Sequence, residues 1–236
     1  CLAQNNETIN YLKKLGAKNI KKLGNLKFSE TSLKNTNKIN KDTKKFFDLK
    51  RILFGAISTH QEEEIFCAKI HADLKKKYVN GVTIVIPRHV HRSSNIKEEI
   101  ENIGLKVHLH SSGGKIDNKT DIYLVDTFGE TKLFIKICNI VFLGGSLIHH
   151  GGQNPIEAAR LGCKVIHGPN IDNFLEVYDL LCQNRISFKI KTIKQAKSII
   201  QKNLNNKFNS KKIIKKLNFI GNKTLLINQK EINKYI

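Results

Sequence analysis

Short apolar runs rich in β-branched residues alternate with helix-periodic segments from Lys50 onward, and this alternation constrains the fold more than any other feature. The pattern is typical of βα units stacked into a parallel sheet with helices on both faces. The runs predicted to be strands are 51–57, 82–86, 105–109, 121–125, 140–143, 163–166 and 186–190. The sequence therefore predicts an α/β protein with a Rossmann-like parallel sheet.

The two ends of the chain lack this alternation. Residues 29–48 are largely polar and predict a linker, with residues 1–28 before it and a ligand-binding domain from 49 to 236 after it. Helical segments dominate the last part of that domain. The chain contains no Met and begins with Cys1, so we expect it to be a fragment of a longer protein.

Composition excludes several classes of protein. The five cysteines are scattered and form no CxxC pair, which favours reduced thiols over a disulfide framework or a zinc cage. No apolar run reaches the roughly 18 residues of a membrane span. The formal net charge of +21 favours anionic partners, namely phosphates, acidic lipid surfaces or nucleic acid. Aromatic residues make up only 7% and do not interleave with basic ones, so a nucleic-acid-binding module is the least favoured reading.

The strongest motif lies directly after the run 140–143, where glycine pairs stand at 144–145 and 151–152. Glycine lets the backbone approach a ligand closely. Asn154 as N-cap, Pro155 at the first helical position and Glu157 at the third predict a helix start, which is a ready site for a phosphate. The alternative, left open, is that Glu157 only completes a capping box.

Three other loops follow predicted strands on the same rim of the sheet, where open α/β sheets bind ligands. Pro87-Arg88 offers a guanidinium suited to phosphate, although a lone Arg is often only a surface charge. Residues 126–130 bring a carboxylate to a helix start. Ser58, Thr59 and His60 follow the first strand, where they can contact a transferred group, but Thr59 with Glu62 also reads as a capping box.

Other familiar sites are absent from the sequence or incomplete. His89 with His91, and the pair 149–150, suggest a metal, but no carboxylate or thiol completes a set at ligand spacing. We therefore expect no metal. The sequence has neither GxxxxGK[ST] nor GxGxxG, which argues against a P-loop nucleotide triphosphatase and a dinucleotide oxidoreductase.

Taken in order, these motifs resemble bacterial Kdo (3-deoxy-D-manno-octulosonic acid) transferases, two-domain glycosyltransferases of the GT-B fold. The resemblance covers most of the chain and falls on their C-terminal half. The matching segments are 2–4, 24–28, 58–60, 87–89, 126–130, 144–147, 151–157, 168–169 and 173–174. One segment alone is weak evidence, but the ordered set is specific.

The resemblance implies that the chain binds the donor, CMP-Kdo. The implied nucleotide-binding residues are Pro87, Arg88, Phe128, Gly129, Glu130, Asn154, Pro155, Ile156 and Glu157. The implied donor-sugar contacts are Ser58, Thr59, His60, Gly145, Ser146 and Gln153. The family's usual Met, Leu and His are Phe128, Ile156 and Gln153 here, and the change at Gln153 is the one expected to alter a polar contact.

The resemblance also implies an inverting transfer to a phosphorylated lipid A precursor, without a metal or other cofactor, at the cytoplasmic face of the bacterial inner membrane. Residues 1–28 then end an acceptor-binding N-terminal domain that supplies the general base. No catalytic residue is expected in this chain, which should bind the donor but be inactive alone. The full-length protein is expected to be peripheral or N-terminally anchored at an anionic membrane surface. The nearest alternative is another GT-B enzyme, a UDP-sugar transferase or UDP-GlcNAc 2-epimerase.

Overall fold

The computed structural model describes residues 1–29, 39–205 and 208–234. The chain divides into two compact units. We call Asn35–Asn209 the sheet unit, and Cys1–Lys34 together with Ser210–Ile236 the terminal unit.

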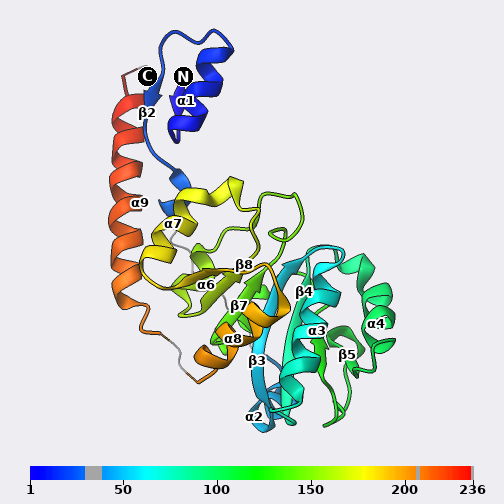
Figure 1. Ribbon diagram of the computed structural model, residues 1–236. Coiled ribbons are helices and arrows are strands. Elements are labelled where there is room, and N and C mark those ends of the chain that lie inside the picture. Colours follow the sequence, from blue (N-terminus) through cyan, green and yellow to red (C-terminus); the bar gives the residue numbers. More distant parts are fainter. Residues whose placement is uncertain (30–38, 206–207, 235–236) are drawn as a thin grey trace. The chain divides into compact units, whose positions relative to one another are not determined.

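The sheet unit contains, among its described residues, a seven-stranded parallel sheet of order β5-β6-β4-β3-β7-β8-β9 (Figure 1). Its strands are β3 (Arg51–Thr59), β4 (Gly81–Pro87), β5 (Val107–Leu109), β6 (Ile122–Leu124), β7 (Ile140–Leu143), β8 (Lys164–His167) and β9 (Ser187–Lys189). All seven predicted strands are confirmed. Strands β3 to β6 form one half of the sheet, and strands β7 to β9 form the other half on the opposite side of β3.

Helices cover both faces of the sheet, as the sequence predicted. They are α2 (Lys41–Leu49), α3 (Glu63–Lys75), α4 (Ser93–Glu101), α5 (Thr131–Ile137), α6 (Ile156–Arg160), α7 (Leu175–Gln183) and α8 (Ile193–Asn203). Side chains of α3, α4 and α8 share one apolar core with residues such as Phe54 and Phe142. Side chains of α2, α5, α6 and α7 share the other with residues such as Tyr123 and Val141. The inner strands β4, β6, β7 and β8 and most of β3 are therefore buried on both faces, whereas the edge strands β5 and β9 are only partly buried.

Helix α2 lies inside the segment predicted to be a linker. Asn40 caps it by accepting a hydrogen bond from the backbone N–H of Thr43, and Phe46 and Phe47 are buried. The ring of Phe47 packs edge-on against Tyr123, with the centroids 5.0 Å apart. Residues 41–48 are therefore part of the packed sheet unit, because two adjacent aromatic side chains anchor an otherwise polar helix. The predicted linker residues 30–38 lie outside the described part of the chain.

The terminal unit contains residues from both ends of the sequence. It contains β1 (Leu2–Ala3), α1 (Asn6–Lys14), β2 (Lys21–Lys22), a short 3-10 helix (Leu26–Ser29) and the long helix α9 (Lys211–Ile232). The sequence analysis placed α9 in the domain that begins at residue 49, whereas the structure groups it with residues 1–34. The assignment of residues 1–28 to an acceptor-binding domain stays a prediction. Within the described ranges, no helix combines the length and hydropathy needed to cross a bilayer.

Candidate functional site

The carboxyl ends of β6, β4, β3 and β7 lie side by side and carry the predicted loops. These strands are consecutive neighbours in the sheet, and the strand order reverses between β3 and β7. Adjacent strands are about 4.8 Å apart, so the four ends span about 15 Å, the size of a nucleotide. Ligands of open α/β sheets bind at such a reversal. The topology therefore places the predicted residues at one rim.

The buried carboxylate of Glu63 connects two of the loops at this rim. It accepts hydrogen bonds from the backbone N–H groups of His60 (3.0 Å), Gly145 (2.7 Å), Ser146 (3.1 Å) and Leu147 (2.9 Å). Glu63 is 1% exposed. Its charge is met by peptide dipoles, and it ties the turn after β3 to the Gly-rich loop after β7.

The sequence analysis missed Glu63 and misassigned its neighbour. Thr59 is the last residue of β3, and Glu62 has a left-handed backbone with φ +74° and makes no side-chain cap. The predicted capping box of Thr59 and Glu62 is therefore wrong. Helix α3 begins at Glu63, three residues beyond the start that a Thr59 cap predicts, and it is the Glu63 carboxylate that reaches back to the N–H of His60. Glu63 and Glu64 are both buried, and only the fold shows that Glu63 is the one that accepts from these backbone N–H groups.

Two glycines give the Gly-rich loop its path. A Cβ at Gly144 would overlap the carbonyl oxygen of Ser58 at the end of β3, and Gly145 has φ +67°. The hydroxyl of Ser146 donates to the carbonyl of Leu143 (2.6 Å) and accepts from the N–H of Gly168 (2.9 Å). Ser146 and Thr59 are both fully buried, so their predicted contacts with a sugar stay predictions.

Cationic and imidazole side chains gather around His60. Its ring centroid lies 4.4 Å from that of His150 and 5.7 Å from that of His89. Burial, with further contributions from His150, His89, Arg88 and Arg92, lowers the pKa of His60 to about 4. His60 is therefore neutral at pH 7, and its buried Nε2 has no hydrogen-bond partner among the described residues. This group of five residues, which we call the cationic cluster, has the electrostatics of an anion site.

Around the cationic cluster, Arg88 and Arg92 differ in their partners. Arg88 is exposed and follows β4, and its backbone N–H donates to the carbonyl of Thr59 (2.9 Å), which fixes its position beside β3. The guanidinium of Arg92 instead pairs with the buried carboxylate of Glu64 at 3.1 Å. No group of three His, Cys, Asp or Glu side chains suited to a metal occurs among the described residues.

The loop after β6 forms a second group with the start of α6. The Glu130 carboxylate accepts from the Thr127 hydroxyl and lies 3.1 Å from Nε2 of His110. Phe128 beside it is 79% exposed. The next helix, α5, contributes Lys132, whose Nζ pairs with the Glu157 carboxylate of α6 at 2.9 Å. This ion pair places the loop with Phe128 and Glu130 beside the loop with Asn154.

Helix α6 begins at Ile156 with Pro155 in the N-cap position, one residue later than predicted, but Asn154 still makes the hydrogen bond expected of a capping side chain. The side-chain oxygen of Asn154 accepts from the N–H of Ile156 (3.1 Å), with Pro155 between them in helical conformation. Helix α6 is only five residues long and ends at Arg160, and Gly162 follows with φ +82°. Pro155 and Ile156 are buried, so they shape the turn.

Gln153 connects the two groups. Its Nε2 and Cδ2 of His150 would lie 3.5 and 3.1 Å from a Cβ at Gly145, so both side chains flank the Gly-rich loop. Asn154 follows directly in sequence. The structure thus brings the cationic cluster, Gln153 and the Asn154 turn together, with Phe128 and Glu130 next to that turn. That a single ligand contacts all of them stays a prediction.

Comparisons with known proteins agree with this geometry. A scan against protein-family models finds no match. The chain is 33% identical over 210 residues to the 3-deoxy-D-manno-octulosonic acid transferase of Rickettsia prowazekii, covering 86% of this chain and 44% of that protein. It is 27% identical over 186 residues to the transferase of the same name from Haemophilus influenzae, covering 79% and 43%. The chain spans less than half the length of these relatives.

Solved structures show the same likeness. The C-terminal CMP-Kdo binding domain of WaaA from Acinetobacter baumannii is 26% identical, with a TM-score of 0.64 over 78% of this chain and 94% of that one. TarM, at 15% identity, has a TM-score of 0.56 over 98% of this chain and 42% of that one, and supports the fold alone. Fold and rim together define a glycosyltransferase domain of the GT-B class. Over most of its length the chain is homologous to 3-deoxy-D-manno-octulosonic acid transferases, as the motifs predicted.

Proposed function

We propose that this chain is the donor-binding part of an inverting glycosyltransferase that moves Kdo from CMP-Kdo to a lipid A precursor. The observation that carries the proposal is the cationic cluster at the strand-order reversal, in a chain homologous to Kdo transferases. A related domain of the same fold is described as CMP-Kdo binding, which supports the choice of donor.

The cationic cluster suits the chemistry of this donor. CMP-Kdo carries one phosphate and one sugar carboxylate, and negative charge grows on the phosphate as the glycosidic bond breaks. In this proposal Arg88, whose backbone is fixed beside β3, binds phosphate oxygens, which its planar guanidinium can do in bidentate fashion. His60 supplies an unpartnered ring nitrogen for a second polar contact. Fixed positive groups at the leaving group stabilise the transition state, so this proposal involves no metal.

The second group suits the nucleoside. The exposed ring of Phe128 offers a face on which cytosine can stack, and Gly129 beside it leaves room because nothing lies near its missing Cβ. The carboxylates of Glu130 and Glu157 are half-buried acceptors for ribose hydroxyls. The turn of Asn154, Pro155 and Ile156 then forms the floor between base and phosphate.

The remainder of the reaction lies outside this chain. We propose that the protein's own N-terminal domain provides the general base and the acceptor groove, so the chain alone binds donor without turnover. The proposed location is the cytoplasmic face of the inner membrane, where the lipid A precursor is an anionic acceptor. The +21 charge is consistent with an anionic membrane surface.

Calorimetry with CMP tests the proposal. Arg88→Ala should weaken CMP binding by about 10- to 100-fold, because a charge-assisted contact is worth about 1.5–3 kcal/mol. Arg185→Gly is the matched control: it removes the same charge from an exposed turn whose φ of +57° glycine accepts, and it should bind CMP like wild type.

Two outcomes would contradict the proposal. If Arg88→Ala leaves the CMP affinity unchanged, Arg88 does not bind the phosphate. Equal or tighter binding of UDP in direct competition favours the rival GT-B enzymes that use UDP-sugars.

A further inference from the structure

The inner face of α9 is fixed by contacts within the terminal unit. Leu217 is fully buried, and a Cβ at Gly221 would overlap the carbonyl oxygen of Phe28. Nδ2 of Asn228 donates to the carbonyl oxygen of Thr224 (2.8 Å) and lies 3.5 Å from that of Leu23. Because these contacts recur along the helix, they also determine which side chains point outward.

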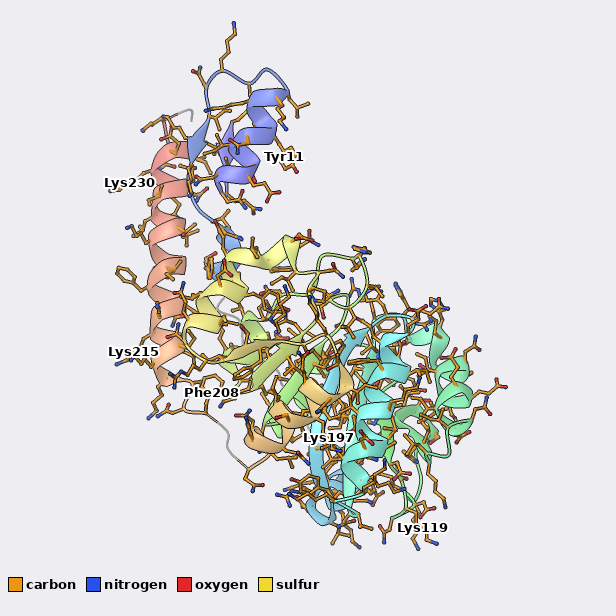
Figure 2. The ribbon with its side chains drawn as sticks, in the orientation of Figure 1. Tyr11, Lys119, Lys197, Phe208, Lys215 and Lys230 are labelled. Atoms are coloured by element: carbon orange, nitrogen blue, oxygen red, sulfur yellow. The ribbon has the colours of Figure 1, made fainter. Side chains whose placement is uncertain are left out.

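The outer face carries a continuous basic stripe. Its members recur every three or four residues along α9, the spacing of one helix face, and extend over about 27 Å. They are Lys212, Lys215, Phe219, Lys223, Leu226 and Lys230, all exposed. We call them the α9 stripe; Lys215 and Lys230 mark its lower and upper parts in Figure 2.

The α9 stripe contains no acidic residue. The one carboxylate of α9 belongs to Glu231, which is buried on the inner face and pairs with Lys21 and Lys234. No ion pair of the four stripe lysines is found within the described residues. The stripe therefore presents unneutralised positive charge, where most helix surfaces mix both signs.

Two large apolar side chains interrupt the lysines. Phe219 is 70% exposed and Leu226 is 57% exposed, although both belong to residue types that folding normally buries. Lysines flank each of them on the helix face. This combination is the signature of helices that lie in a membrane interface, with apolar groups entering the acyl boundary and lysines contacting acidic headgroups.

We propose that the α9 stripe is a docking surface for a bilayer that contains anionic lipids. The inference rests on the proposed function in one respect, since it gives an enzyme with a lipid acceptor a second contact with the membrane. Charge complementarity selects the occupant, because an acidic leaflet attracts each nearby lysine. Nucleic acid would also attract the lysines, but it gives Leu226 no apolar phase to enter. A membrane accounts for both kinds of side chain.

Vesicle binding of the full 236-residue chain tests the proposal. Wild type should bind phosphatidylcholine vesicles containing phosphatidylglycerol, release them at high salt, and leave pure phosphatidylcholine unbound. A variant with Lys212, Lys215, Lys223 and Lys230 changed to Gln should bind about 100-fold more weakly, since each lysine contributes to attraction by the leaflet. Phe219→Ser with Leu226→Ser should weaken binding about 10-fold through lost apolar burial.

A charge-matched control separates this surface from the general excess of lysine. Lys44, Lys115, Lys119 and Lys194 are exposed on the sheet unit, and changing all four to Gln removes the same charge. This control should bind vesicles nearly as wild type does. Equal losses in the control and the α9 variant would overturn the proposal. The proposal would also be overturned if the Phe219 and Leu226 variant bound vesicles as wild type does and wild type bound single-stranded DNA more tightly than vesicles.

CMP calorimetry on the same proteins keeps the two proposals distinguishable. All α9 variants should retain wild-type CMP affinity and wild-type thermal unfolding, because every changed side chain is exposed and lies in the terminal unit. Absence of CMP binding throughout would count against the proposed function and leave the vesicle result standing. Absence of vesicle binding by wild type would overturn the docking surface alone.

Discussion

A buried carboxylate lies at each end of the parallel strands: Glu63 at their carboxyl ends, here called the carboxyl edge, and Asp121 at their amino ends, the amino edge. The charges of the two carboxylates are balanced in different ways. At the carboxyl edge, Glu63 accepts hydrogen bonds from four backbone N–H groups. At the amino edge, Asp121 pairs with Nζ of Lys75 (2.7 Å), accepts from the N–H of Lys106 (3.0 Å) and lies 3.6 Å from Nε2 of His71. In the part of the chain that the structure describes, backbone N–H groups alone balance the charge of Glu63, whereas two side chains and one backbone N–H group balance that of Asp121.

The difference shows how this fold keeps cations available for a ligand. Two lysines of the amino edge are engaged, Lys75 with Asp121 and Lys106 with Asp117 at 3.4 Å. Among the described residues no cationic side chain pairs with Glu63, so the loop beside it is ordered without the side chains of Arg88 and His60, whereas Arg92 pairs with the neighbouring Glu64. An anion site needs an ordered loop and cationic side chains that are not already paired with carboxylates. A carboxylate bound by backbone N–H groups meets both needs, because it orders the loop without pairing with a cationic side chain.

The largest effect is expected from breaking the carboxyl-edge arrangement. Glu63→Gln should lower the free energy of unfolding by about 3–5 kcal/mol, because a buried charged acceptor is lost and backbone donors stay unsatisfied. CMP affinity should fall as well, since the Gly-rich loop loses its anchor. Urea unfolding and calorimetry measure the two effects. The exposed neighbour substitution Glu62→Gln is the control and should change neither. A stability loss below about 1 kcal/mol for Glu63→Gln would show that the loop is held otherwise.

An intermediate effect, with a defined pH dependence, is expected at the amino edge. Burial raises the pKa of Asp121, but the adjacent His71 ring and the hydrogen bonds from the Lys106 backbone and Lys75 outweigh it and hold the pKa at about 2. The unfolded value is about 3.9, so ionised Asp121 contributes roughly 2–3 kcal/mol above about pH 4, which is lost as pH falls through 2.

Asp121→Asn should therefore be less stable than wild type by that amount at pH 7, and the difference should shrink between about pH 4 and pH 2. Unfolding at a series of pH values measures it. CMP affinity should not change, because Asp121 precedes β6 and lies at the opposite edge from the cationic cluster. A difference that stays constant down to pH 2 would contradict the assigned ion pairs.

The smallest effect is expected from Lys75→Gln. The Lys75 side chain is 39% exposed, and Asp121 keeps its contacts with His71 and Lys106, so the loss should be about 1 kcal/mol. Lys76→Gln, which removes an exposed pair with Asp73, is the control and should cost less. A loss in Lys75→Gln equal to that in Asp121→Asn would mean that Lys75 alone balances the amino-edge carboxylate.

Much of the fold could be predicted from the sequence because its strands are buried on both faces. The run 140–143 is apolar throughout, and 82–86 is apolar except for the buried Thr83, as expected of strands covered on both faces. The Asn154 cap was predictable for a similar reason, since the donor and the acceptor are two residues apart. Helix α2 was missed because only Phe46 and Phe47 anchor it, too few for a visible period.

The sequence by itself determined the positions of the strands along the chain, the positions of the loops that follow them and the family likeness, because these depend on local patterns and ordered motifs. Only the tertiary structure decided which of three adjacent glutamates binds the backbone N–H groups of the Gly-rich loop, that His60 lies near two arginines and two other histidines, and that α9 belongs with residues 1–34. The physical reason is distance along the chain. The bond from the N–H of Gly145 to Glu63 joins residues 82 positions apart, and no local pattern encodes which of several equivalent side chains such a contact selects.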